Sequence, residues 1–181
     1  MNQVQIMKLN EFTVIETIGE GHLGKVFLIQ QNTTNKFFAA KVLNIKKETK
    51  EEQDTFLTEI SKYSKVINKF ESILPIFGIN NENFEGESYP TIFSEFMPKG
   101  SLNNIFKANP KLSFTKRYII LLGIAEGINY LHSIEIVHEN LRPNNVLLDD
   151  NYYPHICHFE ENGLISNSFN SFSAPDSSIT Y

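Results

Sequence analysis

The sequence predicts an α+β fold in which a β-rich lobe is followed by a helical one. Two observations support this prediction. Short runs of β-branched and aromatic residues, separated by turn residues, occupy much of the chain up to residue 96. After residue 100 the pattern changes, and apolar residues recur every three or four positions up to about Ser133. Because the strands come first and the helices follow, we expect two separate lobes.

The β-rich part is expected to contain five strands. They cover residues 12–18, 25–30, 36–43, 73–79 and 91–96. Residues 31–35 supply turn chemistry between the second and third strands, and residues 80–88 form a polar loop before the last one. The apolar spacing from Phe56 to Tyr63 predicts an amphipathic helix between the third and fourth strands. The charged stretch 46–54 before this helix is expected to be solvated.

The helical part is expected to contain a short helix and a longer one. Ser101 is a plausible N-cap for the short helix, and Pro110 lies just past its expected end. Ser113 or Thr115 could cap the longer helix, which is expected to run to about Ser133.

Composition limits the classes of function that are open to this chain. Of its 181 residues, 41% are hydrophobic and 20% are charged, which suffices for one sizeable core or two small ones. The net charge of −5 argues against binding to nucleic acid, which requires a basic patch. The single cysteine, Cys157, fits a reducing compartment. The first 12 residues lack a signal-peptide run, and the most apolar stretch, 118–131, is too short to span a bilayer. We therefore expect a cytoplasmic protein without a membrane partner.

A glycine-rich segment, G-x-G-x-x-G-x-V from Gly19 to Val26, is a candidate phosphate-binding loop. The same glycine spacing occurs in dinucleotide-binding folds, where the glycines open a helix. Here the following residues, 25–30, have the pattern of a strand, which indicates a β-hairpin whose backbone N–H groups cover a phosphate. On the motif alone, a hairpin without any ligand is an equal alternative.

The segment 136–148, IVHENLRPNNVLL, follows the long helix and ends in a strand-like run. It resembles the catalytic loop of eukaryotic protein kinases, H-R-D-L-K-P-x-N followed by an apolar strand. Residues 38–41, F-A-A-K, are similar to the V-A-I-K strand of that family and stand in the right place behind the glycine hairpin. The resemblance covers residues 12–176, and it is nearest to the tyrosine-kinase-like serine/threonine branch.

This resemblance implies a two-lobed protein-kinase-like fold in one incomplete domain over residues 1–181. Residues 8–96 would form the N-lobe, an antiparallel sheet with helix C and the nucleotide pocket. Residues 97–181 would form a partial helical C-lobe with the catalytic loop and a short activation segment that ends near S-A-P-D at 173–176. The helices that follow in the family are missing, so the chain is either a fragment or a natural truncation. The long helix is then expected to expose apolar surface.

The resemblance also implies an ATP pocket. Lys41 would reach the α- and β-phosphates and pair with Glu59 on helix C. Backbone groups of Glu95 and Met97, in the hinge between the lobes, would hydrogen-bond the adenine edge, with Ser94 as a small gatekeeper. Taken singly, these residues would be surface charges or core. The full set comprises Ile18, Gly19, Gly21, Gly24, Val26, Ala39, Lys41, Glu59, Ser94, Glu95, Met97 and Leu147.

Within the catalytic loop, Asn140 stands where the family has its catalytic aspartate. That carboxylate accepts the proton of the substrate hydroxyl, and a neutral amide has no useful basicity near neutral pH. Glu139 replaces an arginine that binds phosphorylated activation loops in many members. Arg142 replaces a lysine and keeps the positive charge. Asn145 is the asparagine that the family has at this position, where it has a catalytic role and is also a metal ligand.

The metal site is expected to be degenerate as well. His158 replaces the aspartate of the D-F-G motif that holds magnesium, and Glu160 replaces its glycine. Mg²⁺ prefers oxygen ligands, so a neutral imidazole is a poor substitute and only Asn145 remains of the usual ligands. A minor alternative is that Glu160 lends a carboxylate. Another is a zinc site, with ligands drawn from His138, His155, Cys157 and His158, although structural zinc sites usually contain more cysteine.

These departures favour a pseudokinase, a binding or regulatory module in signalling that holds ATP with Mg²⁺ bound weakly or not at all. The alternative is an active protein kinase that transfers the γ-phosphoryl group of ATP to a protein hydroxyl, with Ser or Thr favoured over Tyr. A third hypothesis is a degenerate fragment without a stable fold. The sequence does not identify a protein partner or substrate.

Overall fold

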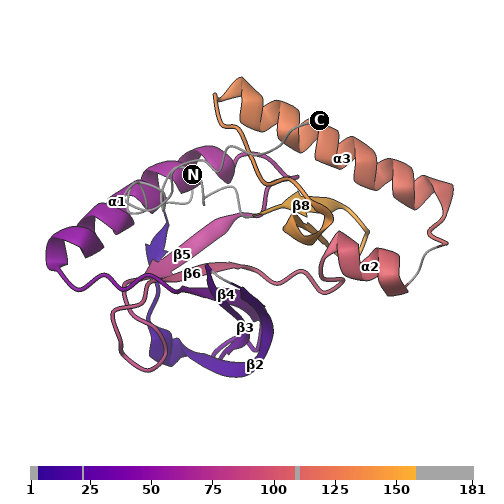
Figure 1. Ribbon diagram of the computed structural model, residues 1–181. Helices are drawn as coiled ribbons and strands as arrows, with labels where there is room; N and C mark the ends of the chain where they lie inside the picture. Colours follow the sequence, from indigo (N-terminus) through magenta and orange to yellow (C-terminus); the bar gives the residue numbers. More distant parts are fainter. Residues whose placement is uncertain (1–3, 22, 109–110, 158–181) are drawn as a thin grey trace, which may run out of the picture.

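A computed structural model describes residues 4–21, 23–108 and 111–157 of the chain. A six-stranded sheet forms one part of the molecule, and two helices with a small β-hairpin form the other (Figure 1). Along the larger sheet the strand order is β1-β5-β6-β4-β3-β2. Its strands are β1 (Gln5–Ile6), β2 (Phe12–Gly21), β3 (Gly24–Gln31), β4 (Phe37–Leu43), β5 (Ile76–Asn80) and β6 (Thr91–Glu95). A short 3-10 helix, Leu9–Glu11, leads into β2.

The five predicted strands of this sheet are all present, and their pairings are antiparallel. The sequence analysis missed β1, which pairs in parallel with the edge strand β5. Met7 extends this pairing, because its N–H donates to the Ile79 carbonyl at 2.9 Å and its carbonyl accepts from the Asn80 side chain at 2.7 Å. The sheet is therefore mixed rather than purely antiparallel.

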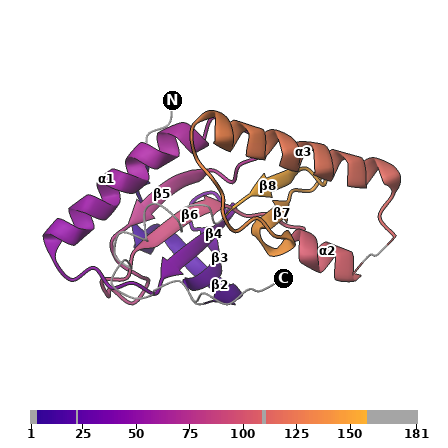
Figure 2. The ribbon, with the colours of Figure 1, turned by 45° about the horizontal axis from the view of Figure 1, so that its top comes forward.

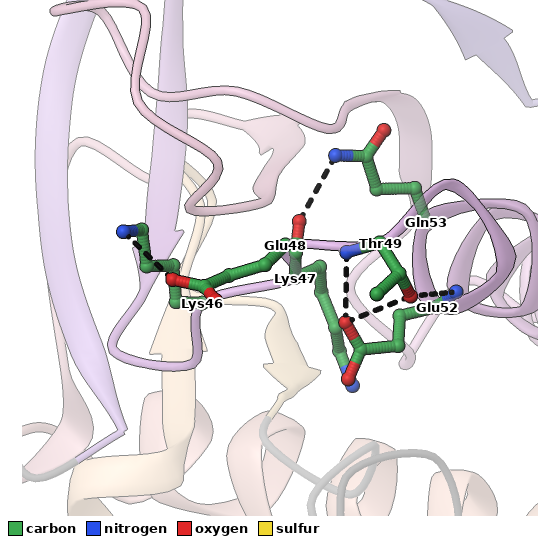
Figure 3. A network of polar contacts seen from close by, with 6 residues as sticks. All are labelled: Lys46, Lys47, Glu48, Thr49, Glu52 and Gln53. Atoms are coloured by element: carbon green, nitrogen blue, oxygen red, sulfur yellow. Dashed lines mark hydrogen bonds and ion pairs between the residues drawn. The ribbon is translucent and has the colours of Figure 1, made fainter.

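Helix α1 (Lys50–Ile67) packs against the sheet through Phe56 and Ile60, which are buried in a core with Leu43, Ile76 and Ile79. The helix begins six residues before the predicted start, so part of the charged stretch is helical. A reciprocal capping box explains this start (Figure 3). The Glu52 N–H donates to Thr49 Oγ1 at 3.2 Å, and the Thr49 N–H donates to Glu52 Oε2 at 3.0 Å. The latter bond is the main reason why the pKa of Glu52 is lowered.

The helical part contains α2 (Leu102–Ala108) and α3 (Phe114–Ser133). Ser101 Oγ accepts from the Asn104 N–H at 3.3 Å, and Ser113 Oγ accepts from the Lys116 N–H at 3.4 Å. Both predicted serine caps are thus confirmed, with Ser113 rather than Thr115 at the start of α3. Helix α3 ends at Ser133, as predicted.

A β-hairpin of β7 (Val146–Leu148) and β8 (Pro154–Ile156) follows the 3-10 helix Pro143–Asn145 and packs against α3. Figure 2 shows α1 over the larger sheet and α3 over this hairpin. Gly127 lets helix and hairpin approach closely, since a Cβ at this position would lie 2.8 Å from the Ile156 side chain. Leu131 and Ile156 share one buried cluster with Phe56 and Ile60 of α1, so the two parts of the molecule share a core.

Helix α3 exposes apolar side chains, as expected: Phe114, Tyr118, Leu121 and Leu122. Within the described residues, no helix is both long enough and apolar enough to cross a membrane.

Candidate nucleotide-binding cleft

A cavity of about 720 Å³ lies where the larger sheet meets the β7–β8 hairpin. Its volume is in the range of small-molecule sites. The residues that line it come from the β2–β3 hairpin, β4, the segment 74–76, β6, the segment 96–101, α2, the segment 142–145, β7 and Cys157. Nearly all the predicted nucleotide-binding residues are among them: Ile18, Gly19, Gly21, Gly24, Val26, Ala39, Lys41, Ser94, Glu95, Met97 and Leu147.

The glycine segment forms the turn between two antiparallel strands, with Gly21 opposite Gly24 and Gly19 opposite Val26. This confirms the predicted hairpin and excludes the alternative in which the glycines open a helix. Gly24 has a φ of 151°, and a Cβ there would overlap the Val42 carbonyl of β4. Only glycine lets β3 lie this close to β4 at the mouth of the cavity.

Lys41 lies on β4 between Val26 of β3 and Ile92 of β6, and its side chain is buried. Ala39 lies two residues earlier on the same strand, opposite Ser94, and both line the cavity. Since side chains two apart on a strand share a face, β4 presents a small residue and a cation to the same space. This arrangement suits a flat apolar ring at Ala39 and an anionic group at Lys41.

Glu59 differs from its predicted place. It is half-buried on α1 and does not line the cavity, but lines a shallow depression along α1 with Lys50, Glu51 and Asp54. None of the ion pairs among the described residues joins it to Lys41. Around the axis of α1, Glu59 lies about 60° from Phe56 and about 100° from Ile60, the two residues that pack on the sheet, so it stands at the edge of the packed face.

The hinge follows β6 directly. Met97 is buried, its carbonyl accepts from the Gly100 N–H at 3.0 Å, and Gly100 has a φ of 68°. The Gly100 carbonyl in turn accepts from the Leu148 N–H at 2.9 Å. The hinge is therefore fixed to β7, whose Leu147 lines the cavity together with Ala39 and Val26.

The loop before β7 is held by polar contacts around the buried His138. The Asn140 N–H donates to His138 Nδ1 at 3.3 Å, so the ring proton lies on Nε2, which donates to the Cys157 carbonyl at 3.0 Å. Asn145 Nδ2 donates to the Asn140 carbonyl at 2.8 Å. Glu139, between His138 and Asn140, has a φ of 56°, a conformation that is uncommon for a residue with a side chain.

The structure brings Arg142 and Asn145 into the cavity lining, but not Asn140, which is half-buried beside it. His158 lies outside the described residues. Sequence reasoning missed Lys99, Asn103, Asn104, Asn144 and Cys157, which also line the cavity. Asn103 and Asn104 stand in the first turn of α2, directly after the hinge, and line the cavity. This pair of polar residues was an available signal in the sequence.

The described residues do not fit a magnesium site. Among the described residues, the carboxylates that line the cavity are Glu20 of the glycine hairpin and Glu95 at the hinge, and neither belongs to the loop that carries Asn145. Nor does the described part of the chain hold a group of three His, Cys, Asp or Glu side chains able to bind a metal. The zinc alternative is therefore not supported for His138, His155 and Cys157.

Comparison with known proteins agrees with this geometry. The family model described as protein kinase domain matches residues 12–177. A probable receptor-like protein kinase of Arabidopsis thaliana is 36% identical over 149 residues, which are 79% of this chain and 17% of that protein. A leucine-rich repeat receptor-like serine/threonine-protein kinase of the same plant is 32% identical over 174 residues, 91% of this chain and 15% of that protein.

The human cAMP-dependent protein kinase catalytic subunit PRKX is 30% identical over 145 residues, 80% of this chain and 39% of that protein. The chain thus spans less than half the length of these relatives. The family model covers most of the chain, and the cleft holds the glycine hairpin, the β4 lysine and the loop asparagine that this family combines. The chain belongs to the protein kinase domain family.

Proposed function

We propose that this chain binds ATP in the cleft and acts as a pseudokinase, a binding or regulatory module with little or no phosphoryl transfer. The observation that carries the proposal is the amide of Asn140 at the position of the family's catalytic carboxylate. An amide can orient a hydroxyl group but cannot take its proton. General-base catalysis is worth about 10²–10⁴-fold in rate.

Nucleotide binding is supported by the composition of the cleft. Lys41 supplies a cation for the phosphates, the glycine hairpin supplies backbone N–H groups, and Ala39 with Leu147 supplies apolar contact for the purine. Proteins of this family use ATP with Mg²⁺. Since the sequence has His158 where the family has its magnesium-binding aspartate, and Mg²⁺ prefers oxygen ligands, we expect ATP binding here to depend little on Mg²⁺.

A titration with ATP, with and without Mg²⁺, tests the binding half of the proposal. The melting temperature of the chain should rise with ATP to a similar extent in both conditions, since a ligand that binds only the folded state stabilises it. The Lys41→Met variant should show a smaller shift. A shift that appears only with Mg²⁺ would contradict the proposed metal independence, and no shift at all would contradict nucleotide binding.

The catalytic half is tested by restoring the missing carboxylates. The native chain should transfer no labelled phosphate to a generic protein substrate, and Asn140→Asp combined with His158→Asp should gain activity. The alternative, an active serine/threonine kinase, is supported by Arg142 and Asn145 in the cleft lining. It is the correct one if the native chain already transfers phosphate as fast as the double variant.

A further inference from the structure

The tip of the glycine hairpin is tied to the C-terminal end of β4. The Asn44 N–H donates to the Leu23 carbonyl at 3.0 Å, and Asn44 Nδ2 donates to the Gly21 carbonyl at 3.4 Å. Strands β3 and β4 pair as far as Gly24, which lies opposite Leu43, so Asn44 continues this pairing past the strands and into the turn. One residue thus holds the turn at two of its carbonyl groups.

The part of the chain that carries Asn44 is itself well anchored. Leu43 directly before it is buried in the core that α1 shares with the sheet. The Leu43 N–H donates to the carbonyl of Pro90, the residue before β6, at 2.9 Å. Three residues after Asn44, the Lys47 N–H donates to the Ser88 carbonyl at 2.8 Å. Asn44 therefore stands between two backbone bonds to the segment before β6, and the hairpin is tied to a fixed point.

Asn44 is placed to act on the cleft without being part of its wall. Gly21, Leu23 and Gly24 line the cavity, whereas Asn44 is not among the lining residues that the structure describes. Its side chain is exposed. A hairpin that covers the phosphates must open for a nucleotide to leave, and the opening of such loops often sets the rate of release. Each bond that holds the tip in place makes this opening less frequent.

We propose that Asn44 is a positioning residue that holds the glycine hairpin over a bound nucleotide and so slows the release of that nucleotide. This inference rests on the proposed binding of ATP in the cleft. The two bonds from Asn44 fix the turn through contacts within the chain itself, so a nucleotide does not need to order it on binding. The bond from the Asn44 side chain to the Gly21 carbonyl is the part of this tie that a substitution removes.

Asn32 offers a matched control away from the tip of the hairpin. It directly follows β3 as Asn44 directly follows β4, and it is exposed as well. Its N–H donates to the Glu11 carbonyl at 2.9 Å, and its Nδ2 donates to the Asn10 carbonyl at 3.2 Å. Asn32 Oδ1 also accepts from the Thr13 hydroxyl at 2.7 Å. Asn32→Ala should therefore cost at least as much stability as Asn44→Ala while it leaves the glycine turn untouched.

The release rate of a fluorescent ATP analogue tests this inference. The 181-residue chain is loaded with N-methylanthraniloyl-ATP, an excess of ATP is added, and release is followed by stopped-flow fluorescence. Asn44→Ala should release the analogue about threefold faster, near the lower limit for the loss of one hydrogen bond, because the bond to Gly21 is long and exposed. Asn44→Leu, which has a similar size but no donor, should behave like Asn44→Ala. Asn32→Ala should release the analogue at the native rate.

Hydrogen exchange measured without nucleotide separates this inference from the proposed function. The backbone N–H at position 44 should be protected in the native chain and should lose protection in Asn44→Ala, because the turn then opens more often. If the native chain binds no analogue, the proposed nucleotide binding is wrong, whatever the exchange shows. If the native chain binds the analogue, three results overturn this inference alone: native release by Asn44→Ala, equally fast release by Asn32→Ala, or unchanged protection at position 44.

Discussion

Replacing Gly24 by alanine tests the geometry of the glycine hairpin directly. The φ of 151° at Gly24 lies in a region that residues with a Cβ rarely adopt, which costs about 1–3 kcal/mol. The added Cβ would also overlap the Val42 carbonyl and lie 3.1 Å from Leu43 Cα. These are backbone atoms of β4 and cannot rotate away, and overpacking of this kind costs about 1–3 kcal/mol.

Together these two costs predict that Gly24→Ala is destabilised by about 3 kcal/mol. For a chain of this size, each kcal/mol lowers the melting temperature by roughly 2–4 °C, so the expected loss is about 6–12 °C. The assay is thermal unfolding followed by circular dichroism, with and without ATP. Because the strain lies where β3 meets β4 beside Lys41, the variant should also lose most of its stabilisation by ATP.

Gly21→Ala is the matched control within the same hairpin. Gly21 stands directly opposite Gly24, and a Cβ there would meet no atom within 4 Å. Its melting temperature should stay within a few degrees of the native value, as for ordinary surface substitutions. If the two variants unfold at the same temperature, the backbone geometry assigned to this hairpin is incorrect.

Two further predictions concern α1 and β8. Thr49→Ala removes the N-cap of α1 and should cost about 1 kcal/mol, which thermal unfolding can measure, whereas Thr49→Ser keeps the hydroxyl and should be near neutral. Equal loss in both variants would contradict the capping box. The lowered pKa of His155 makes stability depend on pH, because below its ordinary value of about 6.5 the unfolded chain binds a proton that the folded chain resists. Stability should therefore be lost as the pH drops below about 6.5, and His155→Phe should show a smaller fall over this range than the native chain. An identical pH dependence in both would contradict the burial of this ring.

Short-range signals in the sequence were sufficient for most of the fold. Hydroxyl caps such as Ser101 and Ser113 act within one helical turn, so their positions mark the helix starts reliably. The T-x-x-E signal of Thr49 and Glu52 was also available, and attention to it would have placed the start of α1 correctly. Strand β1 has two residues and hence no periodicity, and only its partner β5 makes it a strand.

The cleft was predictable where motif spacing fixes backbone register, as for Lys41 opposite Val26. The position of Glu59 was not, because it depends on how α1 rotates against the sheet, which the packing of Phe56 and Ile60 decides. The cavity lined by residues 68–75, 95–98, 149–151 and His155 was not predictable either. His155 stood out in the sequence only as a possible metal ligand, and its actual surroundings come from segments far apart in the chain.

The central claim, that this chain holds ATP without using it, is tested most directly by phosphoryl transfer from γ-labelled ATP. We predict that the native chain transfers no more label to a protein substrate than Lys41→Met does, with either Mg²⁺ or Mn²⁺ present. Transfer by the native chain that disappears in Lys41→Met would contradict the claim and identify an active kinase.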